Sequence, residues 1–319
     1  MSKSAAFSVF LLSAVTVRAA AGDELLDRVR SSYPSALKIL EGAYSQVHGS
    51  GHKKVTIPIK PSGERVITTS FTMAVDGLKQ RVVEKTEDRS PERSGFQEAV
   101  ECVNEKYSFV LKRSVPDAPY LLTGVVPERG EANVAELGSM FRNALYAPFS
   151  VENLLISRMI AQTGFRFIGA NLVQEQGREL IRIQFESTDP KAEISAGVLW
   201  VDPSDGWMLQ RSEYYVHPSR KRLFRSTVDY AKENERSVPK QVNILEPSLL
   251  RREYWFDSIK FEGSPEGDFR LPAFGLPELS GKTGADPSQN HMGTWFIGLG
   301  VASLIAALGF RYFARRGRA

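Results

Sequence analysis

The tripeptide Gly281-Lys282-Thr283 is the first place where residue types suggest chemistry, because Gly-Lys-Thr ends the phosphate-binding loop of many nucleotide-binding proteins. That loop also needs a glycine five positions before the Gly-Lys pair, but position 276 is leucine, and Gly275 comes one residue too early. No strand pattern leads into the tripeptide and no helical pattern follows it directly, so its amides would not surround a phosphate. The sequence therefore predicts neither a nucleotide site nor any other cofactor.

Two histidines, His48 and His52, are four residues apart, which is the spacing of two metal ligands on one face of a helix. Gly49 and Gly51 lie between them, and glycine disfavours a helix. No third ligand type is close in the sequence. The pattern favours histidines in a solvated loop, and we predict no metal site.

A nucleophilic triad is not indicated either. His217 follows a strand pattern and His291 borders an apolar run, and neither has a Ser, Asp or Cys at a diagnostic spacing. Cys102 is the only cysteine and lies between Val100 and Val103, which is typical of a small buried strand residue. We assign no catalytic residue, and a hydrolase with its catalytic residues dispersed over loops is the third alternative.

Positive charge is concentrated at the two ends of the chain. The formal net charge of the 319 residues is +4, but the first 21 residues and the last nine carry six of the cations and no acid. Residues 22–310 are therefore slightly acidic, which argues against nucleic-acid binding, because that needs a basic face. The densest basic run among them, Arg220-Lys221-Arg222 with Arg225, is typical of a solvated turn, and binding of anionic lipid headgroups is the alternative.

The N-terminus has the pattern of a secretory signal peptide. Lys3 precedes an apolar run at residues 5–17, and Ala19-Ala20-Ala21 offers small residues for cleavage. The run is too short for a membrane span. We therefore predict a signal peptide at residues 1–21.

The C-terminus has the pattern of a membrane anchor. Residues 293–310 contain eighteen residues and no charge, enough to cross a hydrocarbon core about 30 Å thick. Four arginines follow, and such clusters stay on the cytoplasmic side; they are Arg311, Arg315, Arg316 and Arg318. We predict a flexible spacer at residues 279–291, a transmembrane helix at 292–313 and a cytoplasmic tail at 314–319. Whether a sorting enzyme cleaves the helix stays open.

Between these ends, the spacing of apolar residues changes between the helical period and the period of two that is typical of strands. Residues 23–47 have helical spacing, with Pro34 predicted to start a second segment. Period-two patterns then predict strands, and Pro203-Ser204-Asp205-Gly206 predicts a tight turn between two of them. The predicted strands are residues 66–73, 78–85, 107–112, 120–126, 165–173, 179–186, 194–202, 207–216, 223–230, 241–245 and 251–261.

Two further helices are predicted inside this series of strands, at residues 131–145 and 150–161. The second carries an apolar stripe; its residues are Leu154, Leu155, Ile156, Met159 and Ile160. Long strand meanders interrupted by helices indicate an α+β fold rather than a parallel sheet.

One hairpin and one closing segment carry a resemblance. The hairpin reads Leu199-Trp200-Val201-Asp202-Pro203, then Gly206-Trp207-Met208-Leu209, then Arg211-Ser212-Glu213-Tyr214, and the closing segment is residues 269–278. Both resemble the bacterial outer-membrane lipoprotein-sorting family, in particular a membrane-anchored, uncharacterised branch of it. The resemblance implies a curved, half-open antiparallel β-barrel wrapped around helices, with an apolar cavity that holds acyl chains in the carrier proteins.

Together these patterns predict one extracytoplasmic domain at residues 22–278, in a single-pass inner-membrane protein of a bacterial cell envelope with a cytoplasmic C-terminus. The leading hypothesis is a tethered, non-catalytic domain that binds a lipid or a lipoprotein acyl chain. Its pocket candidates are Leu154, Leu155, Met159, Trp200 and Trp207. The alternative is an envelope scaffold or sensor that binds a protein partner through its sheet surface. Inward-facing apolar residues are needed by both a cavity and a packed core, so the sequence leaves the two open.

Overall fold

The computed structural model describes residues 17–18, 22–59, 63–88, 95–127, 144–151, 154–175, 177–216, 223–233 and 236–279. The chain divides into two compact units, Met1–Leu276 and Pro277–Ala319, and all described helices and strands belong to the first. The predicted transmembrane helix, cytoplasmic tail and most of the predicted helix at 131–145 lie outside the described residues. None of the helices in the described ranges is long and apolar enough to span a membrane.

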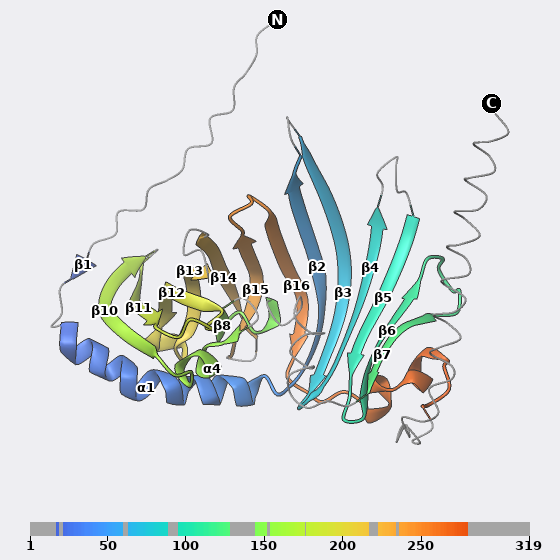
Figure 1. The fold of residues 1–319 in the computed structure, drawn as a ribbon, viewed down its shortest axis with the longest axis horizontal. Coiled ribbons are helices and arrows are strands. Elements are labelled where there is room, and N and C mark those ends of the chain that lie inside the picture. Colours follow the sequence, from blue (N-terminus) through green and yellow to red (C-terminus); the bar gives the residue numbers. More distant parts are fainter. Residues whose placement is uncertain are drawn as a thin grey trace, which may run out of the picture. The chain divides into compact units, whose positions relative to one another are not determined.

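Fourteen of the described strands form one sheet in which every neighbouring pair is antiparallel (Figure 1). Its order is β1 (Val17–Arg18), β10 (Phe165–Glu175), β11 (Arg178–Ser187), β12 (Ile194–Asp202), β13 (Met208–Val216), β14 (Leu223–Glu233), β15 (Arg236–Leu245), β16 (Arg251–Lys260), β2 (Gln46–Pro58), β3 (Glu64–Asp76), β4 (Lys79–Asp88), β5 (Gly95–Val103), β6 (Tyr107–Arg113) and β7 (Leu121–Pro127). Two meanders therefore meet where β16 pairs with β2.

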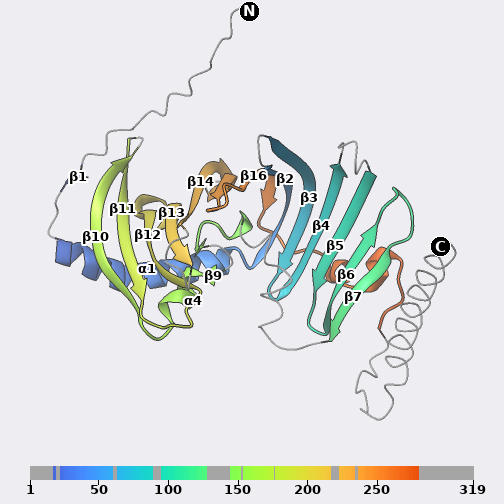
Figure 2. The same ribbon diagram turned by 45° about the horizontal axis from the view of Figure 1, so that its top comes forward.

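The predicted antiparallel sheet with few helices is confirmed. The hairpins β10–β11 and β12–β13 lie side by side in one sheet, as expected from the alternation at Ile181, Ile183 and Phe185, whose side chains are all buried. The sheet curves around helix α1 (Gly22–Ala43), as Figure 2 shows. The end strands β1 and β7 do not pair with each other among the described residues, so the sheet is open.

The prediction that Pro34 starts a second helix was wrong, because α1 is continuous through it and ends at Ala43. A proline inside a helix removes a backbone hydrogen bond and costs about 3 kcal/mol. Val29, Tyr33 and Leu37 follow one another on one face of α1 and are completely buried. Their packing against the sheet offsets the proline penalty and keeps the helix in one piece.

The predicted helix at residues 150–161 is mostly wrong. Ser150–Val151 (β8) and Leu154–Leu155 (β9) pair as a short antiparallel ladder, and the helix α4 covers only Ile156–Ile160. The apolar residues of this run, at 151, 154–156 and 159–161, fit a helical stripe, but spacing alone does not exclude short strands in so short a segment. Packing in the fold determined the local structure, because Ser150 and Val151 are both buried.

The predicted loop around His48 and His52 is also wrong, because both lie within β2. Gly49 and Gly51 do not break this strand but permit it: a Cβ atom would lie 2.3 Å from the carbonyl oxygen of Ser258 at Gly49, and 2.1 Å from that of Trp255 at Gly51. The glycines therefore allow β16 to approach β2 closely.

The sheet has two faces with different covers. The inner face packs against α1 and α4 and forms the main core, which runs from Phe71 on β3 to Ile181 on β11. The outer face of β4 to β6 is covered by the closing segment, defined as the two short 3-10 helices η2 (Glu266–Phe269) and η3 (Leu271–Phe274).

Candidate functional site

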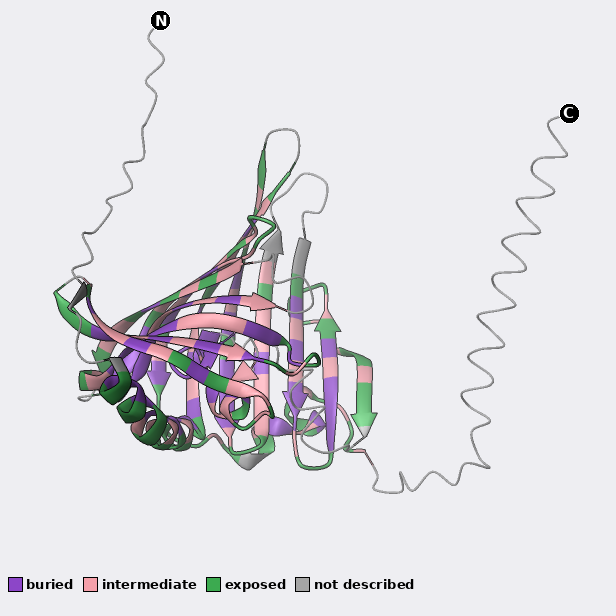
Figure 3. Cartoon of the chain, turned by 60° about the vertical axis from the view of Figure 1, so that its left-hand side comes forward, coloured by how far each residue is buried: buried purple, intermediate pink, exposed green. Residues whose placement is uncertain are grey.

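The contact between α1 and the inner face belongs to the main apolar core. Val29, Tyr33 and Leu37 are 0% exposed, while Ile39, on another side of the same helix, is 73% exposed. Figure 3 shows this division, with exposed residues along the outer side of α1 and buried residues on the strands. One polar contact accompanies the packing, a 3.3 Å hydrogen bond from Arg30 to the carbonyl oxygen of Phe167.

Trp207 completes this contact from the β12–β13 turn in a strained conformation. The turn is η1 (Pro203–Asp205), whose amides of Ser204 and Asp205 donate to the side chain of Asp202. Trp207 then has φ of 64°, in the left-handed region that bulky residues avoid. Its indole stacks on Tyr33 with ring centroids 5.6 Å apart. A strained backbone of this kind persists only where the surrounding structure holds it, and such residues are common at functional sites.

Asp205 ties the same turn to the neighbouring hairpin. Its carboxylate accepts hydrogen bonds from Lys232 at 2.8 Å and from the hydroxyl of Ser237. Burial alone would raise the pKa of Asp205, but these hydrogen bonds outweigh it and lower the pKa below its ordinary value. The turn that carries Trp207 is therefore held by a charged anchor.

Four buried hydroxyls in this region have no hydrogen-bond partner within the described part of the chain. They belong to Tyr33, Tyr44, Ser150 and Ser212. Buried polar groups are nearly always paired, so such a group calls for a specific explanation. The sequence analysis missed all four, because it read the tyrosines only as part of an apolar stripe.

Tyr230, in contrast, is a buried tyrosine whose hydroxyl has a hydrogen-bond partner. Its hydroxyl donates to the carbonyl oxygen of Leu209 at 2.6 Å. Burial raises the pKa of Tyr230 well above its ordinary value, and Tyr44, Asp205 and Tyr33 raise it further. The hydroxyls of Tyr33 and Tyr44 therefore lie within electrostatic range of Tyr230, in one partly polar region of the interior.

The structure brings four of the five pocket candidates to the same contact. Met159 and Trp207 belong to the main core, and the half-buried Leu154 and Leu155 pack against it. Trp200 lies on the outer face instead, in a separate small cluster with Val173 and Leu180. The five residues therefore do not line one surface.

Trp200 has a polar environment on that outer face. The guanidinium groups of Arg211 and Arg182 lie over its ring, 4.5 Å and 5.7 Å from the centroid. Arg211 also pairs with Glu213 at 2.5 Å and with Glu175 at 3.6 Å. These groups balance one another, which is typical of a stabilising surface cluster.

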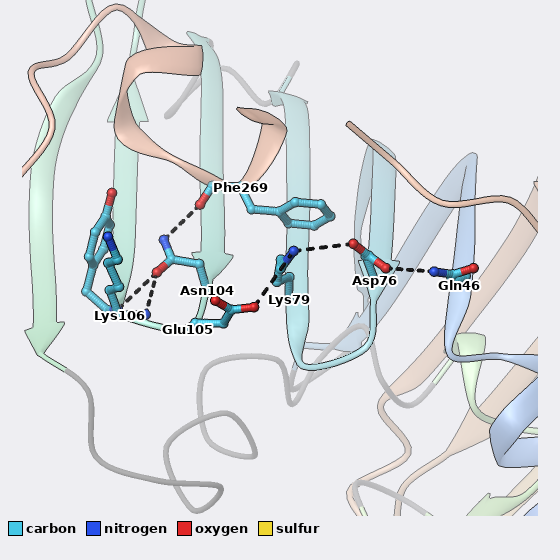
Figure 4. A network of polar contacts seen from close by, with 8 residues as sticks. Gln46, Asp76, Lys79, Asn104, Glu105, Lys106 and Phe269 are labelled. Atoms are coloured by element: carbon cyan, nitrogen blue, oxygen red, sulfur yellow. Dashed lines mark hydrogen bonds and ion pairs between the residues drawn. The ribbon is translucent and has the colours of Figure 1, made fainter. Parts of the chain in front are cut away.

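The closing segment is held to the outer face by directed hydrogen bonds. The carbonyl oxygen of Phe269 accepts from Asn104 at 2.9 Å and from the thiol of Cys102 at 3.3 Å. The side-chain oxygen of Asn104 in turn accepts from the amides of Lys106 and Tyr107. Figure 4 shows this arrangement beside the contacts of Asp76 with Gln46 and Lys79. The prediction that Cys102 is a buried strand residue is confirmed.

The inner face becomes charged away from α1. Lys53 on β2 is 6% exposed and pairs with Glu84 on β4 at 2.5 Å. Burial, followed by the charge of Glu84, raises the pKa of the nearby Glu101. One sheet face thus offers an aromatic region beside α1 and a charged region on β2 to β5.

The two described histidines contact carboxylates. His48 lies 3.2 Å from Glu262, and His52 lies 3.1 Å from Asp257. No group of three or more histidine, cysteine or acidic residues suited to a metal ion occurs within the described ranges.

No protein-family model matches the sequence, and no curated protein is significantly similar to it. Among solved structures, the chain is similar to an outer membrane lipoprotein-sorting protein domain from Vibrio parahaemolyticus, with 11% identity, a TM-score of 0.47 and coverage of 76% of this chain and 98% of the other. A DUF1329 family protein from Desulfovibrio piger matches with 11% identity, a TM-score of 0.46 and coverage of 77% and 98%. A LolA superfamily protein from Nitrosomonas europaea matches with 12% identity, a TM-score of 0.41 and coverage of 75% and 98%. The first of these descriptions names the lipoprotein-sorting family that residues 199–214 and 269–278 resemble.

Proposed function

We propose that the protein is a non-catalytic lipid- or lipoprotein-binding domain, tethered to the inner membrane of a bacterial cell envelope and facing away from the cytoplasm. In this proposal, residues 1–21 direct export and residues 292–313 anchor the chain. The four arginines of the tail keep the C-terminus in the cytoplasm. The ligand is a lipid or the acyl chain of a lipoprotein.

The observation that carries the proposal is the apolar character of the α1 contact. The sheet strands pair with one another through backbone hydrogen bonds, whereas α1 meets them through buried side chains such as Val29 and Leu37. Moving α1 away from the sheet therefore breaks no strand pairing. Acyl chains could then replace one set of apolar contacts with another.

Burial of apolar surface supplies the free energy of the exchange. Each methylene removed from water contributes about 0.8 kcal/mol, and each apolar side chain of α1 that becomes exposed costs about 1.5 to 3 kcal/mol, so the ligand must bury more apolar surface than α1 gives up. The aromatic region would take the chains. The charged region near Lys53 and Glu84 would face a polar headgroup on the same side of the sheet.

The experiment uses the full-length chain and native mass spectrometry to detect lipid that co-purifies with it. Leu155→Glu places a charge at a half-buried position against the core, and Ile39→Glu places the same charge at an exposed position of α1. We expect the wild type and Ile39→Glu to carry lipid and Leu155→Glu to lose it while keeping a cooperative thermal transition. A wild type that carries no lipid and takes none from phosphatidylglycerol vesicles would disprove the proposal.

The scaffold alternative is favoured by one observation, the exposed apolar strand β7. Leu121 is 69% exposed and Leu122 is 43% exposed, and β6 is the one described strand that pairs with β7. Exposed apolar edge strands readily accept another chain. A soluble peptide of residues 107–127 that competes for a captured protein, with no lipid found in the domain, would favour this alternative.

A further inference from the structure

Two buried tyrosine hydroxyls, one in α1 and one directly after it, have no partner among the described residues. Tyr33 is 0% exposed and Tyr44 is 2% exposed. Among the residues that the structure describes, neither hydroxyl has a hydrogen-bond partner. Leaving a buried hydroxyl unpaired is unfavourable, whereas phenylalanine would fill nearly the same space without that penalty.

Aromatic rings surround both side chains. Tyr33 packs between Phe167 and Trp207, with centroids 6.3 Å and 5.6 Å away. Tyr44 meets Phe149 edge to face at 5.1 Å, and Phe261 in the same way at 5.1 Å. These hydroxyls are therefore polar points in an otherwise apolar surface, the arrangement that gives a lipid site its selectivity.

The electrostatics select a neutral ligand atom. Burial raises the pKa of Tyr44, and the carboxylate of Asp205 raises it further. Burial likewise raises the pKa of Tyr33, so both side chains keep their protons and act as donors. An anionic ligand group would have to lose its water on entering this buried aromatic surface, which is unfavourable.

We propose that the hydroxyls of Tyr33 and Tyr44 each donate a hydrogen bond to a carbonyl oxygen of a neutral acyl linkage, so that the site selects acyl esters and amides over free fatty acids and alkyl ethers. The inference rests on the proposed function and specifies its ligand class. An ester or amide carbonyl is a strong neutral acceptor, an ether oxygen is a weak one, and a fatty acid carboxylate is charged at neutral pH.

The test compares dioctanoylglycerol, dioctylglycerol ether and octanoate as probes of the full-length chain by isothermal titration calorimetry. We expect the wild type to bind the ester more tightly than the ether, with Tyr33→Phe and Tyr44→Phe each reducing this preference roughly five-fold. Affinity for the ether should stay unchanged in both variants. Tyr230→Phe is the matched control, because its hydroxyl already donates to Leu209, and it should keep the preference.

The outcomes separate the two proposals. Equal binding of ester and ether by the wild type, or an unchanged preference in both phenylalanine variants, overturns the inference while lipid binding stands. Binding of octanoate as tight as that of the ester overturns it as well. If none of the three probes binds although the wild type carries lipid or takes it from phosphatidylglycerol vesicles, the inference fails and the proposed function stands. If the wild type does neither, both fail.

Discussion

The two covers of this sheet differ in their polar contacts. The closing segment on the outer face buries the side chains of Phe269 and Leu271, and it is also held by hydrogen bonds to the carbonyl oxygen of Phe269 and by an ion pair of 3.2 Å between Arg81 and Asp268. Helix α1 on the inner face is held mainly by aromatic and aliphatic packing, and the hydroxyls of Tyr33 in α1 and of Tyr44 directly after it have no partners in the described chain. Directed bonds fix one geometry, whereas apolar packing tolerates replacement of its partner. Under the function proposed above, α1 is therefore the cover suited to exchange, and the closing segment is a permanent part of the fold.

The largest loss of stability is expected from a substitution in the closing segment. Phe269→Ala should lower the unfolding free energy by about 3 to 5 kcal/mol, because the ring is completely buried and its loss leaves a cavity. Chemical denaturation of the full-length chain measures this, with the exposed Ile39→Ala as a control expected within about 0.5 kcal/mol of the wild type. A loss below 1 kcal/mol for Phe269→Ala would mean that the closing segment is not a structural cover.

A smaller loss of stability is expected when the hydrogen bonds between Asn104 and the closing segment are removed. Asn104→Ala removes one donor and one acceptor and leaves the amides of Lys106 and Tyr107 without their bonds, which should cost about 1 to 3 kcal/mol. Asn104→Asp keeps the acceptor but loses the donor to Phe269, and it should cost less. Equal losses in the two variants would contradict the assigned roles of the two side-chain atoms.

A smaller, pH-dependent effect is expected at the Trp207 turn. The pKa of Asp205 is lowered in the folded state, so its contribution is present above the unfolded value of about 4 and is lost as pH falls through the folded value. Asp205→Asn should therefore cost about 1 kcal/mol at pH 7 and much less at pH 3. Urea denaturation at both values tests this, and an equal loss at the two pH values would contradict it.

The smallest change in stability is expected at α1, and it tests the difference between the two covers most directly. Tyr33→Phe removes an unpaired hydroxyl, so the melting temperature should stay unchanged or rise slightly. Tyr230→Phe breaks the bond to Leu209 and should cost about 1 kcal/mol. If Tyr33→Phe destabilises the ligand-free protein as much as Tyr230→Phe, the hydroxyl of Tyr33 has a partner in the folded chain and the contrast between the covers disappears.

Local patterns in the sequence predicted most of the strands. The alternation at Ile181, Ile183 and Phe185 predicts a half-buried strand, and the turn residues from Pro203 to Gly206 predict its neighbouring hairpin. These signals involve residues close in the chain, so they can be read without knowing the fold.

Long-range pairing was not predictable in the same way. Ser50 and Ser258 meet at 3.1 Å across the β16–β2 junction, although 208 residues separate them. Nothing in either strand alone specifies the other, because the match depends on the whole sheet. Pro239 also hid the start of β15, since proline is rare in strands; here it pairs with Tyr230 at a bulge.

The positions of single side chains in the candidate site were not fully predictable from the sequence either. Trp200 and Trp207 belong to the same motif, but their rings lie on different faces. Trp200 follows the alternation of β12, opposite to Leu199 and Val201, whereas Trp207 lies in the turn with a left-handed backbone. Strand alternation cannot predict the position of Trp207, because it assumes a regular backbone. The types of Tyr33 and Tyr44 were visible, but whether a hydroxyl has a partner depends on the folded interior.

The contact between α1 and β10 has a consequence for synthesis of the chain. Arg30 and Phe167, which meet in that contact, are 137 residues apart, so the helix emerges long before the strand that covers it. Contacts between distant residues form slowly, and the hairpins β2–β3 and β3–β4 can form first because their pairing is local. During that interval the apolar stripe of α1 faces water or another molecule. Assembly of this protein therefore includes a stage at which a holding chaperone, or an early ligand, would protect the nascent chain from aggregation.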